Sequence, residues 1–208
     1  MKITKYLHSC LLIQNAKTTV LIDPGNYTFQ EQVFPFDTIP TIDYIAITHE
    51  HQDHMDPDFI KALVEKYPHV RIIANEVIKE LLVKNALVVE STASNPLSTT
   101  LLHHEEMLDF PLPINWGITV FDALFHPGDS LQFTSSPKIL ALPIQAPWGS
   151  MVHAARQGLA AKPQYILPIH DYHWKDDARL TFYQWLTSYF AQHNITFLQP
   201  ETGIPIEI

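Results

Sequence analysis

The sequence predicts an α/β fold. Short apolar runs of strand length alternate with longer runs whose apolar residues recur at helical spacing, a pattern that favours α/β domains over all-β sandwiches. Histidine or aspartate follows several of the strand-like runs, so polar residues gather where strands end. With 208 residues, of which 46% are hydrophobic, the chain can bury one core, and we expect residues 1–208 to form a single domain.

The first half of the chain is predicted to alternate strands with two helices. The opening forty residues are strand and turn, and they end in a loop over residues 24–40. A helix is expected over residues 56–64, where Pro57 suits the first turn and Phe59 and Leu63 repeat at helical spacing. Further apolar runs predict strands over residues 42–47, 70–74 and 86–89 and a second helix over residues 76–84.

The second half begins with a proline-rich loop. Pro111 and Pro113 exclude a central strand over residues 108–115. The last predicted helix places Leu180, Tyr183, Leu186 and Phe190 along one face, and we expect its aromatic residues to belong to the core. Apolar runs predict strands over residues 116–122, 138–142 and 165–169, and helices over residues 150–161 and 176–193.

Composition excludes several classes of protein. The formal net charge is −9 with only 13 Lys and Arg, which argues against a protein that gathers nucleic acid by bulk electrostatics. Cys10 is the single cysteine, so no intramolecular disulfide forms. No apolar stretch reaches the roughly eighteen residues of a membrane span, and the amino terminus enters a strand pattern rather than a signal peptide. We expect a cytoplasmic protein that acts on a small molecule, without membrane or nucleic-acid partners, and a homo-oligomer stays open.

The densest motif lies in residues 48–54, which read Thr-His-Glu-His-Gln-Asp-His directly after an apolar run. Imidazole and carboxylate are ligands that zinc and similar divalent ions prefer. Side chains alternate faces in an extended segment, so His49, His51 and Asp53 would project together. A turn near Asp53 would bring His54 back to the same pocket. The segment could therefore give His49 and His51 to one ion and Asp53 and His54 to a second.

The order His-x-His-x-Asp-His resembles the signature of the metallo-β-lactamase superfamily. Three further matches follow the order of that family: the opening runs 6–13 and 20–25, the segment 125–130 and the segment 165–170. The spacing is most similar to the branch that contains ascorbate-6-phosphate lactonase, although Leu7 stands where that branch usually has glycine. The resemblance implies a four-layer αββα sandwich with metals at one edge.

The resemblance also implies ligands in the second half of the chain. In the lactonase-like branch a ligand histidine precedes a loop with spaced prolines, and counting back from Pro111 and Pro113 favours His103 over His104. Asp129, in the turn Pro-Gly-Asp, matches the carboxylate that bridges both ions. The last ligand is expected to be His170, at a strand end, rather than His173. Asp23 resembles the buried acid that orients a ligand histidine, and the roles of His8 and His126 stay open.

The expected reaction is hydrolysis assisted by two divalent ions, with Zn²⁺ as the first expectation and Mn²⁺ as the alternative. Two close ions lower the pKa of a water between them toward roughly 7, and the resulting hydroxide attacks the substrate. Asp53 is expected to be the catalytic residue, which ligates one ion and accepts or orients the proton. The predicted enzyme is thus a metal-dependent hydrolase of a small ester or lactone. The alternatives are a phosphodiesterase with the same site and a non-catalytic metal-binding module.

Overall fold

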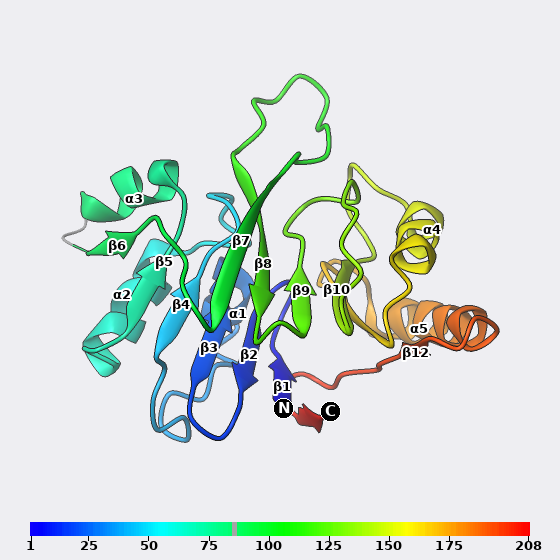
Figure 1. The fold of residues 1–208 in the computed structure, drawn as a ribbon, viewed down its shortest axis with the longest axis horizontal. Coiled ribbons are helices and arrows are strands. Elements are labelled where there is room, and N and C mark those ends of the chain that lie inside the picture. The colour runs from blue at the N-terminus through cyan, green and yellow to red at the C-terminus, as the bar shows by residue number, and fades with distance from the viewer. Residues whose placement is uncertain (85–86) are drawn as a thin grey trace. The chain divides into compact units, whose positions relative to one another are not determined.

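The structure is a computed structural model that describes residues 1–84 and 87–208. The chain divides into two compact units, which we describe separately. Unit 1 comprises residues 1–95 and 201–208, and unit 2 comprises residues 96–200. Each unit contains one mixed β-sheet and its own helices (Figure 1). The predicted α/β class is therefore confirmed.

Unit 1 has a seven-stranded sheet of strand order β13-β1-β2-β3-β4-β5-β6. The pairs β13–β1, β1–β2 and β2–β3 are antiparallel, whereas β3 to β6 run parallel. Because β3 and β4 are parallel neighbours, the loops that follow both strands begin at the same edge of the sheet. The strands are β1 Lys2–Lys5, β2 Leu11–Gln14, β3 Thr19–Ile22, β4 Tyr44–Ala46, β5 Arg71–Ile73, β6 Val89–Glu90 and β13 Pro205–Glu207.

The helices of unit 1 are α1 Asn26–Gln30, α2 Pro57–Lys66 and α3 Glu76–Val83. Helix α2 begins where its sequence predicts, because the Asp56 carboxylate accepts a hydrogen bond from the Phe59 amide at 2.9 Å. Its buried face, which includes Phe59, packs into the main core of the unit, and the Phe59 ring stacks on Phe29 at 5.1 Å between centroids. Residues 48–54 therefore lie between a buried strand and a firmly anchored helix.

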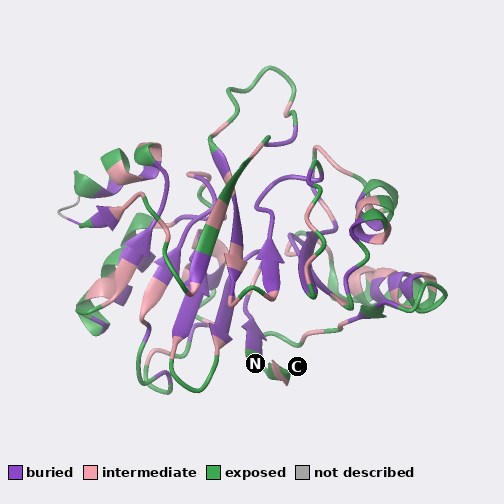
Figure 2. Cartoon of the chain, in the orientation of Figure 1, coloured by how far each residue is buried: buried purple, intermediate pink, exposed green. Residues whose placement is uncertain are grey.

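Unit 2 has a six-stranded sheet of strand order β12-β11-β10-β9-β8-β7. Strands β7 to β9 are antiparallel, and β9 to β12 are parallel. Strands β9 and β10 are buried along their whole length, while β7 carries mostly exposed or half-buried residues (Figure 2). The strands are β7 Leu97–Leu102, β8 Asn115–Val120, β9 Leu124–His126, β10 Ile139–Pro143, β11 Tyr165–Ile169 and β12 Thr196–Phe197.

Helices α4 Met151–Ala161 and α5 Asp176–Ala191 complete unit 2. Gly158 of α4 lets the helix approach the core closely, because a Cβ there would lie 3.0 Å from Leu142 and 3.1 Å from Phe190. Helix α5 buries Tyr183, Leu186 and Phe190 as predicted. Leu180 was expected on the same face, but it is 57% exposed.

Several elements differ from the sequence prediction. The first strand-like run, residues 6–13, contains a turn, and β2 begins only at Leu11. The expected loop 24–40 contains the short helix α1. The predicted strand 86–89 is observed as β6 at Val89–Glu90, and Ala86 lies outside the described residues. Strand β7 was not predicted because its three leucines do not alternate with its polar residues and most of its residues are exposed or half-buried. It forms through a six-residue pairing with β8.

Strand β11 contains a proline, Pro168. It is tolerated there because the neighbouring β12 pairs only with Tyr165 and Ile166 and needs no amide from Pro168.

Within residues 1–84 and 87–208, no helix combines the length and the apolar character needed to cross a membrane.

Candidate metal centre

Residues 48–54 of unit 1 bring three imidazole rings together. His49 and His54 are fully buried, and their ring centroids are 4.1 Å apart. His49 Nε2 lies 3.1 Å from His51 Nδ1. The amide of His54 donates to the carbonyl of His51 at 2.9 Å, so the chain turns here before α2 begins. The turn expected near Asp53 is therefore present.

Asp23 organises these imidazoles from the end of β3. Its buried carboxylate accepts hydrogen bonds from the Thr48 amide and hydroxyl, both at 2.8 Å, and from His54 Nδ1 at 2.7 Å. His49 Nδ1 donates in turn to the Thr48 hydroxyl oxygen at 3.0 Å. Both rings thus use Nδ1 for a fixed partner and present Nε2 as the ligand atom. The sequence indicated the contact of Asp23 with a ligand histidine, but it gave no sign of the part played by Thr48.

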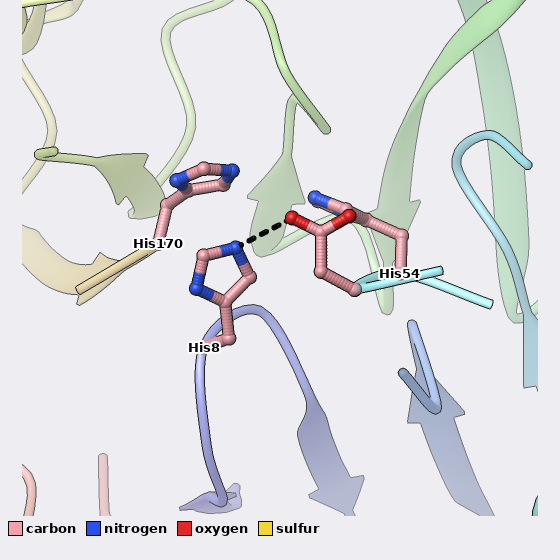
Figure 3. Close-up of side chains that lie close together, drawn as sticks. His8, His54 and His170 are labelled. Carbon is pink, nitrogen blue, oxygen red and sulfur yellow. Dashed lines mark hydrogen bonds and ion pairs between the residues drawn. The ribbon is translucent and has the colours of Figure 1, made fainter. Parts of the chain in front are cut away.

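Asp53 lies beside His8, which comes from the turn between β1 and β2. His8 Nε2 is 3.1 Å from Asp53 Oδ2, and Figure 3 draws this contact as a dashed line from the His8 ring. Each of His8, Asp53 and His54 offers a ligand atom, and the three atoms lie within 4.8 Å of one another. His8 is 1% exposed, whereas the Asp53 side chain is 24% exposed. Asp53 is therefore the more open member of this cluster.

Gly25 fixes the backbone that carries Asp53. A Cβ on Gly25 would lie 1.9 Å from the carbonyl oxygen of Asp53, so only glycine lets the two segments approach. The amide of Asn26 also donates to the carbonyl of Gln52 at 2.8 Å. The loop after β3 and the metal-motif loop after β4 are thereby held together.

In unit 2, two imidazoles converge on the carboxylate of Asp129. His104 Nε2 lies 3.5 Å from Asp129 Oδ2, and His170 Nε2 lies 3.3 Å from the same oxygen. The Nδ1 of His104 donates to the carbonyl of Glu105 at 2.7 Å, and the Nδ1 of His170 donates to the carbonyl of Gln145 at 2.6 Å. These two rings also use Nδ1 for a fixed partner and direct Nε2 at one carboxylate.

The loop of Asp129 is held by its neighbours. Asn115, at the start of β8, accepts from the Asp129 amide at 3.3 Å and donates to the carbonyl of Pro127 at 2.9 Å. The turn passes through Gly128, whose φ of 60° suits glycine. Trp148 donates from its indole nitrogen to Asp129 Oδ2 at 3.3 Å, a contact that no sequence pattern indicated.

Among the alternatives that the sequence left open, the structure brings His104 rather than the preferred His103 to Asp129. His103 is exposed just beyond the end of β7, while His104 is buried. The difference is one residue, and in extended chain one residue reverses the direction of the side chain. His170 is buried beside Asp129, whereas His173 is exposed. His126 is buried and accepts from the Gly128 amide at 3.1 Å, so it braces the turn that presents Asp129.

The donor set of each unit fits divalent ions such as zinc. Two ligands on one tetrahedral ion lie about 3.3 Å apart when each bond is about 2.0–2.1 Å long. The separations are 3.1 Å for His49 and His51, 3.3 Å for His170 and Asp129, and 3.5 Å for His104 and Asp129. The fixed partners on Nδ1 are those that a metal-ligating histidine needs.

Sequence comparison decides the family. A family profile described as a beta-lactamase superfamily domain matches residues 2–170. The chain belongs to the metallo-β-lactamase superfamily. Protein Rv0786c of Mycobacterium tuberculosis is 30% identical over 199 residues, which cover 90% of this chain and 92% of that protein.

Two of the proteins that resemble the chain are named as metal-dependent hydrolases. One from Oenococcus oeni is 47% identical over 62 residues, or 28% of this chain and 25% of the relative. The crystal structure of one from Parabacteroides distasonis superposes with a TM-score of 0.73 at 22% identity, covering 96% of this chain and 92% of the other, and shows the shared fold. The superfamily expected from the sequence is thus confirmed, and the lactonase-like branch stays a prediction.

Proposed function

We propose that the chain is a metal-dependent hydrolase that acts on a small ester or lactone. The observation that carries the proposal is the shared arrangement of four buried imidazoles. His49, His54, His104 and His170 each use Nδ1 for a fixed hydrogen-bond partner. This arrangement selects the tautomer in which Nε2 is the atom that can bind metal.

The proposed ligands come from the family pattern, which assigns them to two ions. The donor chemistry of the individual residues supports the proposal. His104 takes the role of the ligand for which the sequence favoured His103. When bound, two divalent ions, zinc first or manganese, would lower the pKa of a bound water toward roughly 7 and polarise a substrate carbonyl. The proposed ligands are His49, His51, Asp53, His54, His104, Asp129 and His170.

Asp53 is the proposed catalytic residue. Its carboxylate is the more accessible of the two proposed carboxylate ligands, with 24% of the side chain exposed, whereas that of Asp129 is 3% exposed. A carboxylate that is open to solvent can receive the proton that water releases when it attacks the acyl carbon. Asp129 is enclosed by Trp148 and two imidazoles, which suits a ligand and not a proton acceptor.

A cavity of unit 2 supports the choice of substrate. It has a volume of about 460 Å³ and lies between the end of β7 and the loop before β8. No lysine or arginine lines it, so a phosphodiester would find no cation there, while an apolar acyl group would find a suitable surface. One wall is His104, a proposed ligand. The lining residues are Leu101, Leu102, His103, His104, Leu112, Pro113 and Ile114.

The test begins with protein purified without added metal. We expect about two zinc or manganese ions per chain, turnover of a nitrophenyl ester or a γ-lactone, and loss of turnover in Asp53→Ala or after chelation. Full activity of Asp53→Ala would remove its catalytic role. Turnover of a phosphodiester alone would favour the alternative hydrolase, and bound metal without turnover of any of these substrates would favour the non-catalytic metal-binding module.

Three further predictions accompany this function. We propose that residues 1–208 work as one catalytic domain, that the protein is cytoplasmic, and that it has no nucleic-acid partner. The formal net charge of −9 supports the last of these. A homo-oligomer remains open to measurement by light scattering.

A further inference from the structure

We propose that His8 is the positioning residue of Asp53, an inference that rests on the function proposed above. Its Nε2 lies 3.1 Å from Asp53 Oδ2, within the usual range of N–H···O hydrogen bonds (Figure 3). An ionised carboxylate can only accept, so the His8 ring donates from Nε2. The bond fixes the rotation of the Asp53 carboxylate, and we assign its other oxygen, Oδ1, to the ion and the transferred proton.

The backbone at His8 is held in an unfavourable conformation. Its φ is 58°, in the left-handed region that residues other than glycine seldom adopt. The surrounding turn maintains it, because the Tyr6 amide donates to the Cys10 carbonyl at 2.9 Å and the Cys10 amide donates to the Leu7 carbonyl at 3.1 Å. The turn therefore fixes the backbone from which the His8 side chain projects.

The His8 ring is also confined from two sides. The Tyr27 ring meets it edge-on at 5.3 Å between centroids, and the His54 ring meets it edge-on at 5.8 Å. Thr28 anchors the turn, because its hydroxyl accepts from the Leu7 amide at 3.3 Å. Burial and then the negative charge of Asp53 raise the pKa of Tyr27, so this phenol stays neutral beside the carboxylate. His8, at 1% exposed, therefore has one orientation, and in that orientation it contacts Asp53.

In the pair of His8 and Asp53, the imidazole and the carboxylate have the opposite roles to those in the pair of Asp23 and His54. There a buried carboxylate orients an imidazole that is a proposed ligand. Here a buried imidazole orients a carboxylate that is a proposed ligand. In both of these pairs, the ligand of this loop is held by a group from an earlier part of the chain, His8 before β2 or Asp23 after β3.

The rival role of His8 is that of an additional metal ligand, since its ligand atom lies within 4.8 Å of those of Asp53 and His54. Zinc binding separates the two roles. The experiment compares wild-type protein with His8→Ala, His8→Gln, Asp53→Ala and the double variant. It measures the zinc content, the zinc affinity by competition with a chromophoric chelator, and kcat and KM for a nitrophenyl ester.

We expect His8→Ala to keep the zinc content of the wild-type protein. Its zinc affinity or its kcat should fall by about 10–100-fold, while its KM changes much less. His8→Gln should recover most of the loss, because its amide N–H can reach the same carboxylate oxygen. The double variant should bind zinc no more weakly than Asp53→Ala alone, because His8 acts through Asp53. His69→Ala, which removes an exposed imidazole of the same unit, is the matched control and should equal wild type.

Loss of one zinc equivalent in His8→Ala would make His8 a ligand and overturn the inference, as would wild-type zinc affinity and kcat. An equal effect of His8→Ala with and without Asp53 would also overturn it. Should His8→Ala fail to fold, His8→Asn takes its place, because asparagine tolerates the left-handed backbone but its shorter side chain cannot reach as far as Nε2. Wild-type protein that neither binds zinc nor hydrolyses esters would instead overturn the proposed function itself.

Discussion

Tyr183 of α5 donates a hydrogen bond to the buried carboxylate of Asp171, the residue that follows His170. The bond joins the last long helix of the chain to the loop that carries a proposed metal ligand. His170 itself has a φ of 63°, so this loop leaves β11 in a conformation that needs external support. The phenol of Tyr183 supplies part of that support.

Tyr183→Phe should therefore lower stability. The variant removes a donor from a buried carboxylate, which costs about 1–3 kcal/mol in the free energy of unfolding. Urea denaturation of metal-stripped protein measures the change. Tyr189→Phe on the same helix is the control, because its hydroxyl has no hydrogen bond among the described residues. Equal stability of the two variants would contradict the prediction.

Stability should fall as the pH rises above about 10, where phenols of the unfolded chain ionise. Burial raises the pKa of Tyr6 and of Tyr183 in the folded state, and the carboxylate of Asp171 raises that of Tyr183 further. The unfolded chain then releases protons that the folded chain retains, so alkaline pH favours unfolding. Denaturation at pH values of about 8, 9.5 and 10.5 measures how the free energy of unfolding falls with pH. The fall should be less steep in Tyr6→Phe.

Gly25→Ala should disrupt the metal-motif loop. The added methyl group would overlap the Asp53 carbonyl oxygen, which lies 1.9 Å from the Cβ position, and backbone cannot move as a flexible side chain can. We expect a loss of about 3 kcal/mol or more in unfolding free energy, together with weaker zinc binding. Gly149→Ala, whose Cβ would make an ordinary contact of 3.5 Å with Leu131, is the control. Wild-type zinc binding by Gly25→Ala would refute this reading of the loop.

Asp23→Asn should weaken metal binding although Asp23 is not itself a proposed ligand. The amide of asparagine can keep the bond from Thr48, but its NH₂ group would face His54 Nδ1 and disfavour the required tautomer. A zinc affinity about 10–100-fold lower is expected from chelator competition. Asp43→Asn, at a carboxylate that accepts from the Thr19 amide in the same sheet, should change the affinity little.

The apolar cavity beside His104 should give a preference for longer acyl groups. Burial contributes about 0.8 kcal/mol per methylene, or roughly fourfold in kcat/KM for each added carbon until the cavity is filled. Leu112→Ser should reduce the ratio of kcat/KM for hexanoate to that for acetate nitrophenyl esters. Leu180→Ser, which alters an equally apolar but remote exposed side chain of α5, should leave the ratio unchanged. A flat dependence on chain length in wild type would show that the cavity does not take the acyl group.

The sequence predicted those helices and strands whose caps and apolar residues lie within the element itself. Helix α2 carries its own cap at Asp56 and its own apolar face, and β11 was placed at Tyr165–Ile169, as observed. Strands β7 and β13 were missed, because they depend on partners distant in the sequence: β7 on β8, and β13 on β1 at the opposite end of the chain. A strand without alternation of apolar and polar residues, or one of only three residues, has too little pattern of its own to be recognised.

The sequence by itself determined the chemistry of the site: the residue types of the segment 48–54, the turn that presents Asp129, and through them the superfamily. Only the tertiary structure decided which of two adjacent histidines lies beside Asp129 and which groups hold His54 and Asp53. Those outcomes depend on the direction of a side chain at a strand end and on partners 31 and 45 residues away in the chain. Ligand type is a property of one residue, whereas orientation is a property of everything packed around it.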